Sequence, residues 1–175
     1  GASNVAVGAS SMGANTTASN NTSVGYSSLA ACTTGAGNTA VGAIALDAIT
    51  TSADNTAVGH QALTNASSGA GNTAIGKATM TAVVTGSNNV AVGRYALSAN
   101  TSASNNVAVG INALVTNTTG GNATAVGGEA LAANTTGARN TAFGYQSSAA
   151  NTTGYDNVSV GYGSLKTCTT GYNNA

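Results

Sequence analysis

A short pattern of polar, small and apolar residues, Asn-Thr-Ala-Val-Gly or a close variant, recurs along the whole chain at a constant spacing of 17 residues. Its glycine, here called the repeat glycine, stands at positions 8, 25, 42, 59, 76, 93, 110, 127, 144 and 161. Copies without a single insertion or deletion are typical of a repeat protein, in which each unit buries its apolar side by stacking on its neighbours. We therefore expect residues 1–175 to form one repeat domain, as a segment of a longer fibre.

Two positions of the repeat are apolar in nearly every copy. Counted from the repeat glycine, they are position −1, directly before it, and position +4, four residues after it. We expect both columns to face inward, because regularly recurring apolar positions mark the buried side of an element. The predicted core residues are Val41, Val58, Val92, Val109 and Phe143 at position −1, and Leu46, Leu63, Leu97, Leu114 and Leu131 at position +4.

The residues around position −1 indicate a short strand in each copy. A β-branched residue stands two places before the Val, so segments such as 38–41 and 106–109 predict strands. Corners such as Asn-Thr-Thr-Gly at 117–120 favour turns, because Gly adopts positive φ and Asn bonds its own backbone. We predict an all-β solenoid or β-roll of ten 17-residue coils stacked in parallel, each with two short extended pieces and two turns.

Polar residues also keep to fixed columns. Asn occupies position −4 in every copy except one, where Ala123 replaces it, and we expect these amides to bond from coil to coil as a ladder. All charged residues occur at positions +1, +2, +5 and +12, which we expect to face water. The same reasoning predicts that all six tyrosines are exposed.

Net charge and the length of apolar stretches exclude two classes of partner, nucleic acid and the membrane. Four Lys and Arg balance four Asp and Glu, and no basic run exists, so nucleic acid is not an expected partner. No apolar stretch approaches the 18 residues of a membrane-spanning helix, so we expect no membrane insertion.

Candidate catalytic and cofactor motifs are weak. Residues 71–77 resemble the start of a phosphate-binding loop ending in Lys77, but Ala78 stands where a hydroxyl is needed to hold magnesium. His60 is the only histidine and has no Cys or carboxylate near it in sequence, whereas metal binding and acid–base catalysis need partners within bonding reach. We expect no enzyme activity, no cofactor and no metal.

Two further residue sets leave alternatives open. Cys32 and Cys168 share position +7 eight coils apart, too far to pair within one chain, so they are either small semi-buried thiols or links between chains. Asn-x-Ser/Thr triplets are either glycan acceptors or simply turn residues. These triplets begin at several asparagines, including Asn15, Asn100, Asn117, Asn134 and Asn151.

Four of the six tyrosines gather near the C-terminal end and are the candidate surface-contact residues. They are Tyr145, Tyr155, Tyr162 and Tyr172. An exposed Tyr offers a flat apolar face with a polar tip, which suits contacts with a glycan or a host-surface protein. Alternatively, these side chains pack along the rod or against a neighbouring chain.

The repeats Asn-Val-Ala-Val-Gly at 89–93 and 106–110 resemble the head repeats of trimeric autotransporter adhesins, and also those of phage tail fibres. The resemblance covers all ten copies. In the adhesin family it implies a left-handed parallel β-roll of three chains side by side, carried on the cell surface to bind host matrix or receptors. The coil of this chain is longer by a few residues, because of its Asn-Thr-Thr-Gly corner.

These observations favour a structural role as spacer or adhesive shaft of an extracellular or virion fibre. We expect self-association, with a homotrimer slightly favoured over an end-to-end filament. The alternative is an ice-binding or other ligand-binding solenoid surface, since regular ranks of Thr order water on some solenoids. Against ice binding, the Thr pairs are adjacent in sequence and therefore point to opposite faces, and Val84 interrupts one rank.

Overall fold

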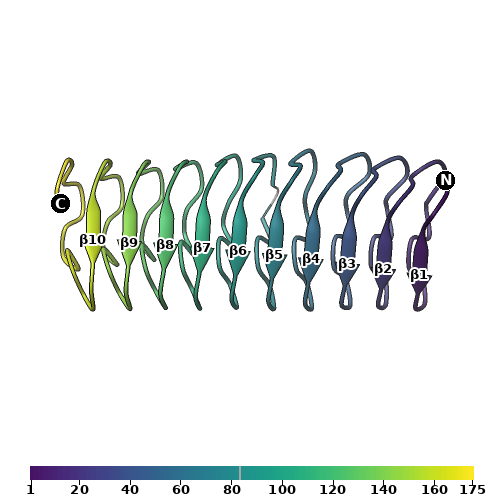
Figure 1. The fold of residues 1–175 in the computed structure, drawn as a ribbon, viewed down its shortest axis with the longest axis horizontal. Helices are drawn as coiled ribbons and strands as arrows, with labels where there is room; N and C mark the ends of the chain where they lie inside the picture. The colour runs from purple at the N-terminus through teal and green to yellow at the C-terminus, as the bar shows by residue number, and fades with distance from the viewer. Residues whose placement is uncertain (83) are drawn as a thin grey trace.

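The computed structural model describes residues 1–82 and 84–175 and contains ten three-residue strands, one per repeat. All ten lie in one parallel sheet in sequence order, and Figure 1 shows them side by side in a single row. The strands are β1 Val5–Val7, β2 Thr22–Val24, β3 Thr39–Val41, β4 Thr56–Val58, β5 Thr73–Ile75, β6 Val90–Val92, β7 Val107–Val109, β8 Thr124–Val126, β9 Thr141–Phe143 and β10 Val158–Val160. The predicted parallel β-solenoid is confirmed.

Each strand pairs with the next in a register of one full repeat. Ala40 lies opposite Ala57 and Val41 opposite Val58, and the same offset holds along the sheet. Coil n is therefore defined from position −4 before the nth repeat glycine to position +12 after it, so coil 6 is 89–105. The expected second extended piece is not formed as a strand in the described residues, where the rest of each coil consists mainly of turns and bends.

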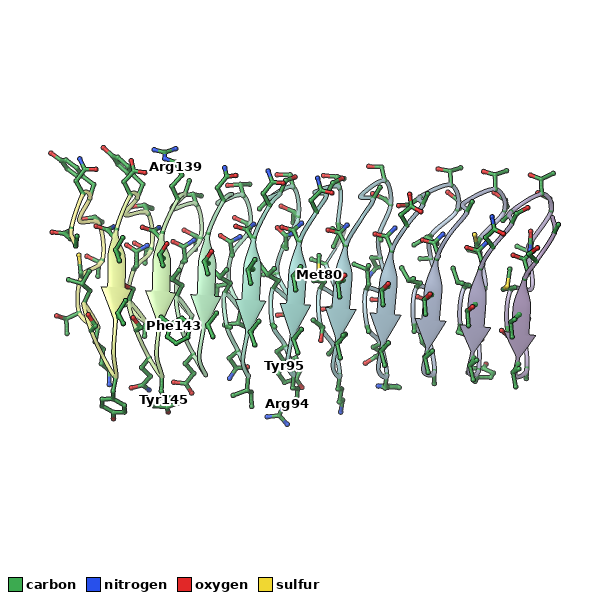
Figure 2. All side chains as sticks on the ribbon, viewed as in Figure 1. Met80, Arg94, Tyr95, Arg139, Phe143 and Tyr145 are labelled. Carbon is green, nitrogen blue, oxygen red and sulfur yellow. The ribbon has the colours of Figure 1, made fainter. Side chains whose placement is uncertain are left out.

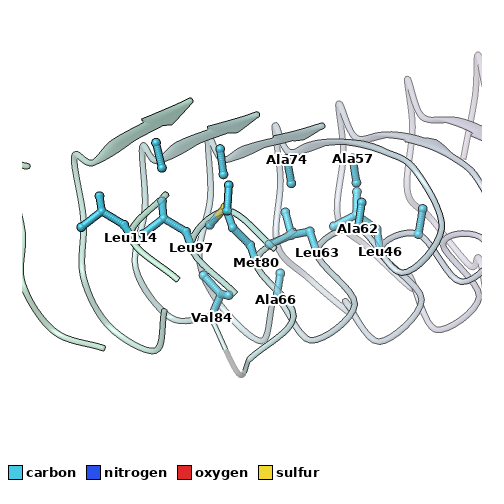
Figure 3. Packing of buried hydrophobic residues seen from close by; sticks show 14 of the residues in the cluster. Leu46, Ala57, Ala62, Leu63, Ala66, Ala74, Met80, Val84, Leu97 and Leu114 are labelled. Carbon is cyan, nitrogen blue, oxygen red and sulfur yellow. The ribbon is translucent and has the colours of Figure 1, made fainter. Parts of the chain in front are cut away.

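The interior is filled by the small residue at the centre of each strand and by the Leu at position +4. Ala57 and Ala74 point from β4 and β5 toward the stacked Leu column, as Figure 3 shows. The predicted Leu column is fully buried, with an exposed fraction of 0% at Leu46, Leu63, Leu97, Leu114 and Leu131.

The prediction that position −1 is core is wrong. Phe143 is 55% exposed and Val41 36% exposed, while Val58, Val92 and Val109 are half-buried. Side chains alternate along a strand, so a three-residue strand directs either its centre or its two ends inward. A coil of 17 residues is too narrow to hold Val and Leu across from each other, and the strand therefore directs its Ala inward.

The asparagines at position −4 form the expected ladder. The side-chain oxygen of Asn38 accepts a hydrogen bond from the backbone N–H of Asn55 at 3.0 Å, and the Nδ2 of Asn38 donates to the carbonyl of Ser52 at 2.9 Å. Each buried amide thus joins two coils and the opposite wall of its own coil. At the one break in the column, the N–H of Ala123 still donates to Asn106 at 2.8 Å, but Ala123 offers no amide to coil 9.

Backbone geometry explains why glycine holds the repeat position. Gly42 has a φ of +134°, and a Cβ there would lie 2.5 Å from the carbonyl oxygen of Gly59 in the next coil. A sharp turn follows at position +4, where the backbone of the core residue is in the left-handed conformation, with a φ of 51° at Leu46 and Leu114. Among residues 1–82 and 84–175, no helix is long and apolar enough to cross a membrane.

Candidate interaction surfaces

The outer side of the sheet is an uncharged surface with a regular period. It is formed by the side chains at positions −3 and −1, here called the sheet face, and neither position holds Asp, Glu, Lys or Arg in any strand. Its most exposed apolar members are Val5, Val7, Val41, Ile75, Val90, Phe143, Val158 and Val160. The residues predicted as core at position −1 therefore contribute instead to an outward surface.

The four candidate tyrosines form two separate ladders. Tyr145 and Tyr162, both at position +1, stack with ring centroids 5.7 Å apart. Tyr155 and Tyr172, both at position +11, stack at 5.3 Å with nearly parallel rings. All six tyrosines are exposed, as predicted. In Figure 2, Tyr145 lies beyond the lower ends of the strands, whereas Arg139, which belongs to the Tyr155 ladder, lies beyond their upper ends.

Each tyrosine ladder has charged or amide neighbours. Beside the Tyr155 ladder, Arg139 donates two hydrogen bonds to Asp156 at 2.6 and 2.9 Å, and its guanidinium lies 6.0 Å from the centre of the Tyr155 ring. These hydrogen bonds lower the pKa of Asp156. Beside the Tyr145 ladder, Gln146 donates to Glu129 at 2.7 Å. The candidate residues therefore belong to two different surfaces rather than one site.

Position +1 carries a second feature, which the sequence reasoning missed. His60, Lys77 and Arg94 occupy this position in coils 4, 5 and 6, and all three are exposed. We call them the cationic row, in which Lys77 and Arg94 carry the charge. The signal was present in the sequence, because the three residues recur at the repeat spacing.

Most of the candidate glycan acceptors are inaccessible. Asn100, Asn117 and Asn134 are 0% exposed and Asn151 is 2% exposed, while Asn15 is half-buried. Their amides instead bond within the interior; Asn134, for example, donates to Asn117 at 2.8 Å and to the carbonyl of Gly137 at 2.9 Å. A folded coil therefore cannot present these four side chains to a glycosylating enzyme.

The Thr pairs of the corners divide their roles, as their adjacency predicted. The hydroxyl at position +8 donates to the carbonyl of the next coil, as Thr118 does to Thr135 at 3.0 Å. The neighbouring residue at position +9 is Thr or Ser in every coil and is exposed throughout. The corners therefore carry a rank of outward hydroxyls that changes at coil 5, where Val84 at position +8 is buried with 0% exposure and Thr85 donates to the carbonyl of Thr101 at 3.1 Å.

The residues singled out for chemistry lie apart. His60 and Lys77 are exposed on neighbouring coils, Cys32 is buried and Cys168 is half-buried. Burial raises the pKa of the Cys32 thiol, which keeps it protonated and unreactive. Within residues 1–82 and 84–175, no three His, Cys, Asp or Glu gather closely enough to hold a metal ion.

Comparison of the chain with protein-family models, with curated proteins and with solved structures finds no match. The features that bear on function are the sheet face, the two tyrosine ladders and the cationic row.

Proposed function

We propose that this chain is a structural segment of an extracellular or virion fibre, in which it acts as a spacer or adhesive shaft without enzyme activity. The observation that carries the proposal is the sheet face, which runs the whole length of a ten-strand sheet and bears no charge. At position −1 every strand carries Val, Ile or Phe, which makes a continuous apolar row along the sheet, and monomeric soluble proteins rarely expose large continuous apolar patches. Such a surface is typical of one that another protein covers.

A second copy of the same chain fits this surface best. Its side chains repeat at the strand spacing of about 4.8 Å, so ridges on one copy can fill the grooves of another along the whole length. A globular partner has no such period. We propose that several copies lie side by side with their sheet faces inward, and we favour three chains, the number that the resemblance to trimeric adhesins implies.

The sheet face can be tested with two matched isoleucines. Ile75 is 40% exposed on the sheet face and Ile111 is 44% exposed on the corner at position +1. We expect Ile75→Lys to dissociate the assembly, because a buried unpaired charge is strongly unfavourable at an interface. Ile111→Lys should leave the assembly intact. Sedimentation equilibrium measures the difference, with circular dichroism to confirm that both variants fold.

The proposal would fail if the unmodified chain sediments as a monomer at all concentrations. It would also fail if Ile111→Lys dissociates the assembly as fully as Ile75→Lys does, because the sheet face would then have no special part in it.

Within the proposed fibre, the Tyr145 and Tyr155 ladders are contact points for a glycan or a host-surface protein. The two ladders lie on different corners, and this supports contacts along two edges of the rod. Replacing Tyr145 and Tyr162 together with Ser should preserve assembly and weaken attachment to the surface that the fibre binds, because both side chains are exposed.

Ice binding is the second candidate, and the exposed hydroxyl rank at position +9 is the observation that favours it. The rank is regular, but the facing Thr at position +8 is bonded to the backbone, so a two-column Thr surface is not formed at this corner. Thermal hysteresis of the purified chain decides the matter. A measurable depression of the freezing point that disappears in Thr119→Leu with Thr136→Leu would replace the fibre proposal with this one.

A further inference from the structure

The cationic row concentrates the few basic groups of this chain in one place. The chain has four Lys and Arg and one His, and three of these five residues occupy position +1 in consecutive coils. The backbone holds them in register, since the carbonyls of His60, Lys77 and Arg94 accept hydrogen bonds from the following coil at 3.0, 3.2 and 3.0 Å. Their side chains therefore start about one strand spacing, roughly 4.8 Å, apart.

Among residues 1–82 and 84–175, no acidic side chain forms an ion pair with this row. The one ion pair among the described residues joins Arg139 to Asp156, in coils 8 and 9. Glu129 is two coils beyond Arg94, roughly 10 Å along the axis, which exceeds the screening length of about 8 Å at physiological salt. Arg94 instead lies over the ring of Tyr95, 5.1 Å from its centre, and Figure 2 shows it beyond the lower ends of the strands.

The row continues along the same corner as an apolar and aromatic strip. A Cβ at Gly128 would lie 3.2 Å from Cδ2 of Tyr145 and 3.4 Å from Cγ2 of Ile111, so the side chains of Ile111 and Tyr145 flank this glycine on its two sides. Tyr162 stacks on Tyr145 and extends the strip by one coil. One corner of the rod thus presents cations first and exposed tyrosines afterwards.

We infer that this corner binds an acidic polysaccharide, laid along the rod with its carboxylate or sulfate groups against the cationic row and its sugar rings against the apolar strip. The surface is linear, so it fits an extended polymer whose charged groups recur. Tyr side chains supply apolar faces and hydroxyls that suit sugars. Nucleic acid fits less well, because its affinity depends on neutralising many phosphates and this row offers few cations.

The inference rests on the proposed extracellular role, where such polymers are found, and names the ligand class for it. Each single contact between exposed charges is weak and screened by salt. We therefore expect binding that is salt-sensitive and strengthened when several copies in a fibre engage one polymer chain.

Arg139 serves as the control for Arg94. Both arginines are exposed and lie over a Tyr ring, but Arg139 is paired with Asp156 and only Arg94 belongs to the cationic row. Binding of the assembled protein to immobilised hyaluronate, dextran sulfate, neutral dextran and single-stranded DNA is measured at low and high salt. We expect the unmodified protein to bind one or both acidic polysaccharides. Arg94→Gln with Lys77→Gln should weaken this binding roughly tenfold, and Arg139→Gln should leave it within about twofold.

The two acidic polymers separate carboxylate recognition from sulfate recognition. The inference is overturned if neither acidic polymer binds, if neutral dextran or DNA binds as tightly, or if Arg139→Gln weakens binding as much as the cationic-row variant does. Sedimentation of the same samples keeps this result distinct from the fibre proposal. A variant that still assembles but no longer binds supports the row alone, whereas loss of assembly concerns the sheet face.

Discussion

Coils 2 to 5 and coils 6 to 9 share the parallel sheet and the buried column at position +4 but fill one side of the interior with different chemistry. In coils 2 to 5 this side holds apolar groups: Cys32, Ile49 and Ala66 at position +7, and Val84 at position +8. In coils 6 to 9 it holds Asn100, Asn117, Asn134 and Asn151 at position +7. All eight side chains are at most 2% exposed.

The two halves therefore stabilise the same stack by different means. The apolar half gains transfer free energy, about 25 cal/mol for each Å² of apolar surface buried, without directional bonds. The amide half gains hydrogen bonds from coil to coil, such as those from Asn151 to Asn134 and from Asn134 to Asn117, both 2.8 Å. A hydrogen-bonded column also specifies the register, because a shifted coil would leave buried amides without partners.

The largest expected effect comes from the buried Leu column, and it tests whether the two halves differ only at positions +7 and +8. Leu63 and Leu114 belong to the shared Leu column, one in each half, and both are 0% exposed. Replacing either with Ala should lower the free energy of unfolding by about 2–5 kcal/mol, because it leaves a cavity. Urea unfolding should give similar losses for the two variants. A loss several times larger in one half would show that the halves differ in more than position +7.

The next effect breaks the amide column at its centre. Asn134→Ala removes the hydrogen bonds to Asn117 and Gly137 and leaves the buried oxygen of Asn117 without its donor. We expect a loss of about 1–3 kcal/mol in the free energy of unfolding. Hydrogen exchange should show the loss of protection mainly in coils 7 to 9, since each coil contacts only its neighbours.

The control is Asn65→Ala, because Asn65 is an exposed asparagine that also donates two hydrogen bonds, to the carbonyl of Thr81 at 2.8 Å and to the hydroxyl of Thr64 at 3.4 Å. It should cost less than about 0.5 kcal/mol, as most surface substitutions do. Equal losses for the two variants would contradict a special role for the buried column.

Local and regular features of this fold were predictable from the sequence, but which side chains of each strand face the interior was not. The spacing of the repeat glycine gave the coil length, the parallel stack, the Asn ladder and the buried Leu column. The sequence Thr-Ala-Val leaves open which side of the strand faces the interior, because Val is more apolar than Ala and would be expected inside. Once the Leu at position +4 enters from the opposite side, only a small residue such as Ala fits there (Figure 3). The hydrophobicity of a residue does not indicate how much space the interior of the coil offers its side chain.

The candidate surfaces show the same limit. The exposure of the tyrosines was predictable because four of them stand in the charged columns +1 and +2 and the other two at the variable position +11. Their division into two ladders was not, because it depends on how positions +1 and +11 are placed around the coil. The burial of Asn100, Asn117, Asn134 and Asn151 was missed because a polar corner suggests a surface turn. Their column mates Cys32 and Ile49, which are apolar, were the signal that this position faces inward.

A smaller effect is expected from a substitution that extends the amide column by one coil. The side-chain oxygen of Asn151 is buried without a partner, and Cys168 stands at the same position in coil 10. Cys168→Asn would place a donor there, as Asn151 does for Asn134, and its own oxygen can reach water because Cys168 is half-buried. We expect a gain of about 0.5–1.5 kcal/mol, measured as a higher urea midpoint.

The matched change in the other half is Ile49→Asn, which places an amide between Cys32 and Ala66. Neither neighbour at position +7 is an Asn that could exchange hydrogen bonds with it, and we expect a loss of about 1–3 kcal/mol instead. Gains of the same size at both positions would show that the neighbouring coil does not decide which chemistry the column accepts.

The smallest effect is a difference in acid between two aspartates, one in coil 3 and one in coil 9. Desolvation by burial raises the pKa of Asp47, whereas hydrogen bonds from Arg139 lower the pKa of Asp156. A lowered pKa in the folded state contributes stability above the unfolded value of about 3.9, and this contribution disappears as the pH falls. A raised pKa acts in the opposite direction, since the ionised Asp47 weakens the fold and protonation relieves it.

At neutral pH we therefore expect Asp47→Asn to raise the thermal midpoint slightly and Asp156→Asn to lower it slightly. The Asp47 difference should fade as the pH falls below the unfolded value of about 3.9, whereas the Asp156 difference fades only at lower pH, as the pH falls through its lowered folded-state pKa. Calorimetry across this range measures them, and shifts of the same sign for the two variants would contradict the contrast between the buried and the paired carboxylate.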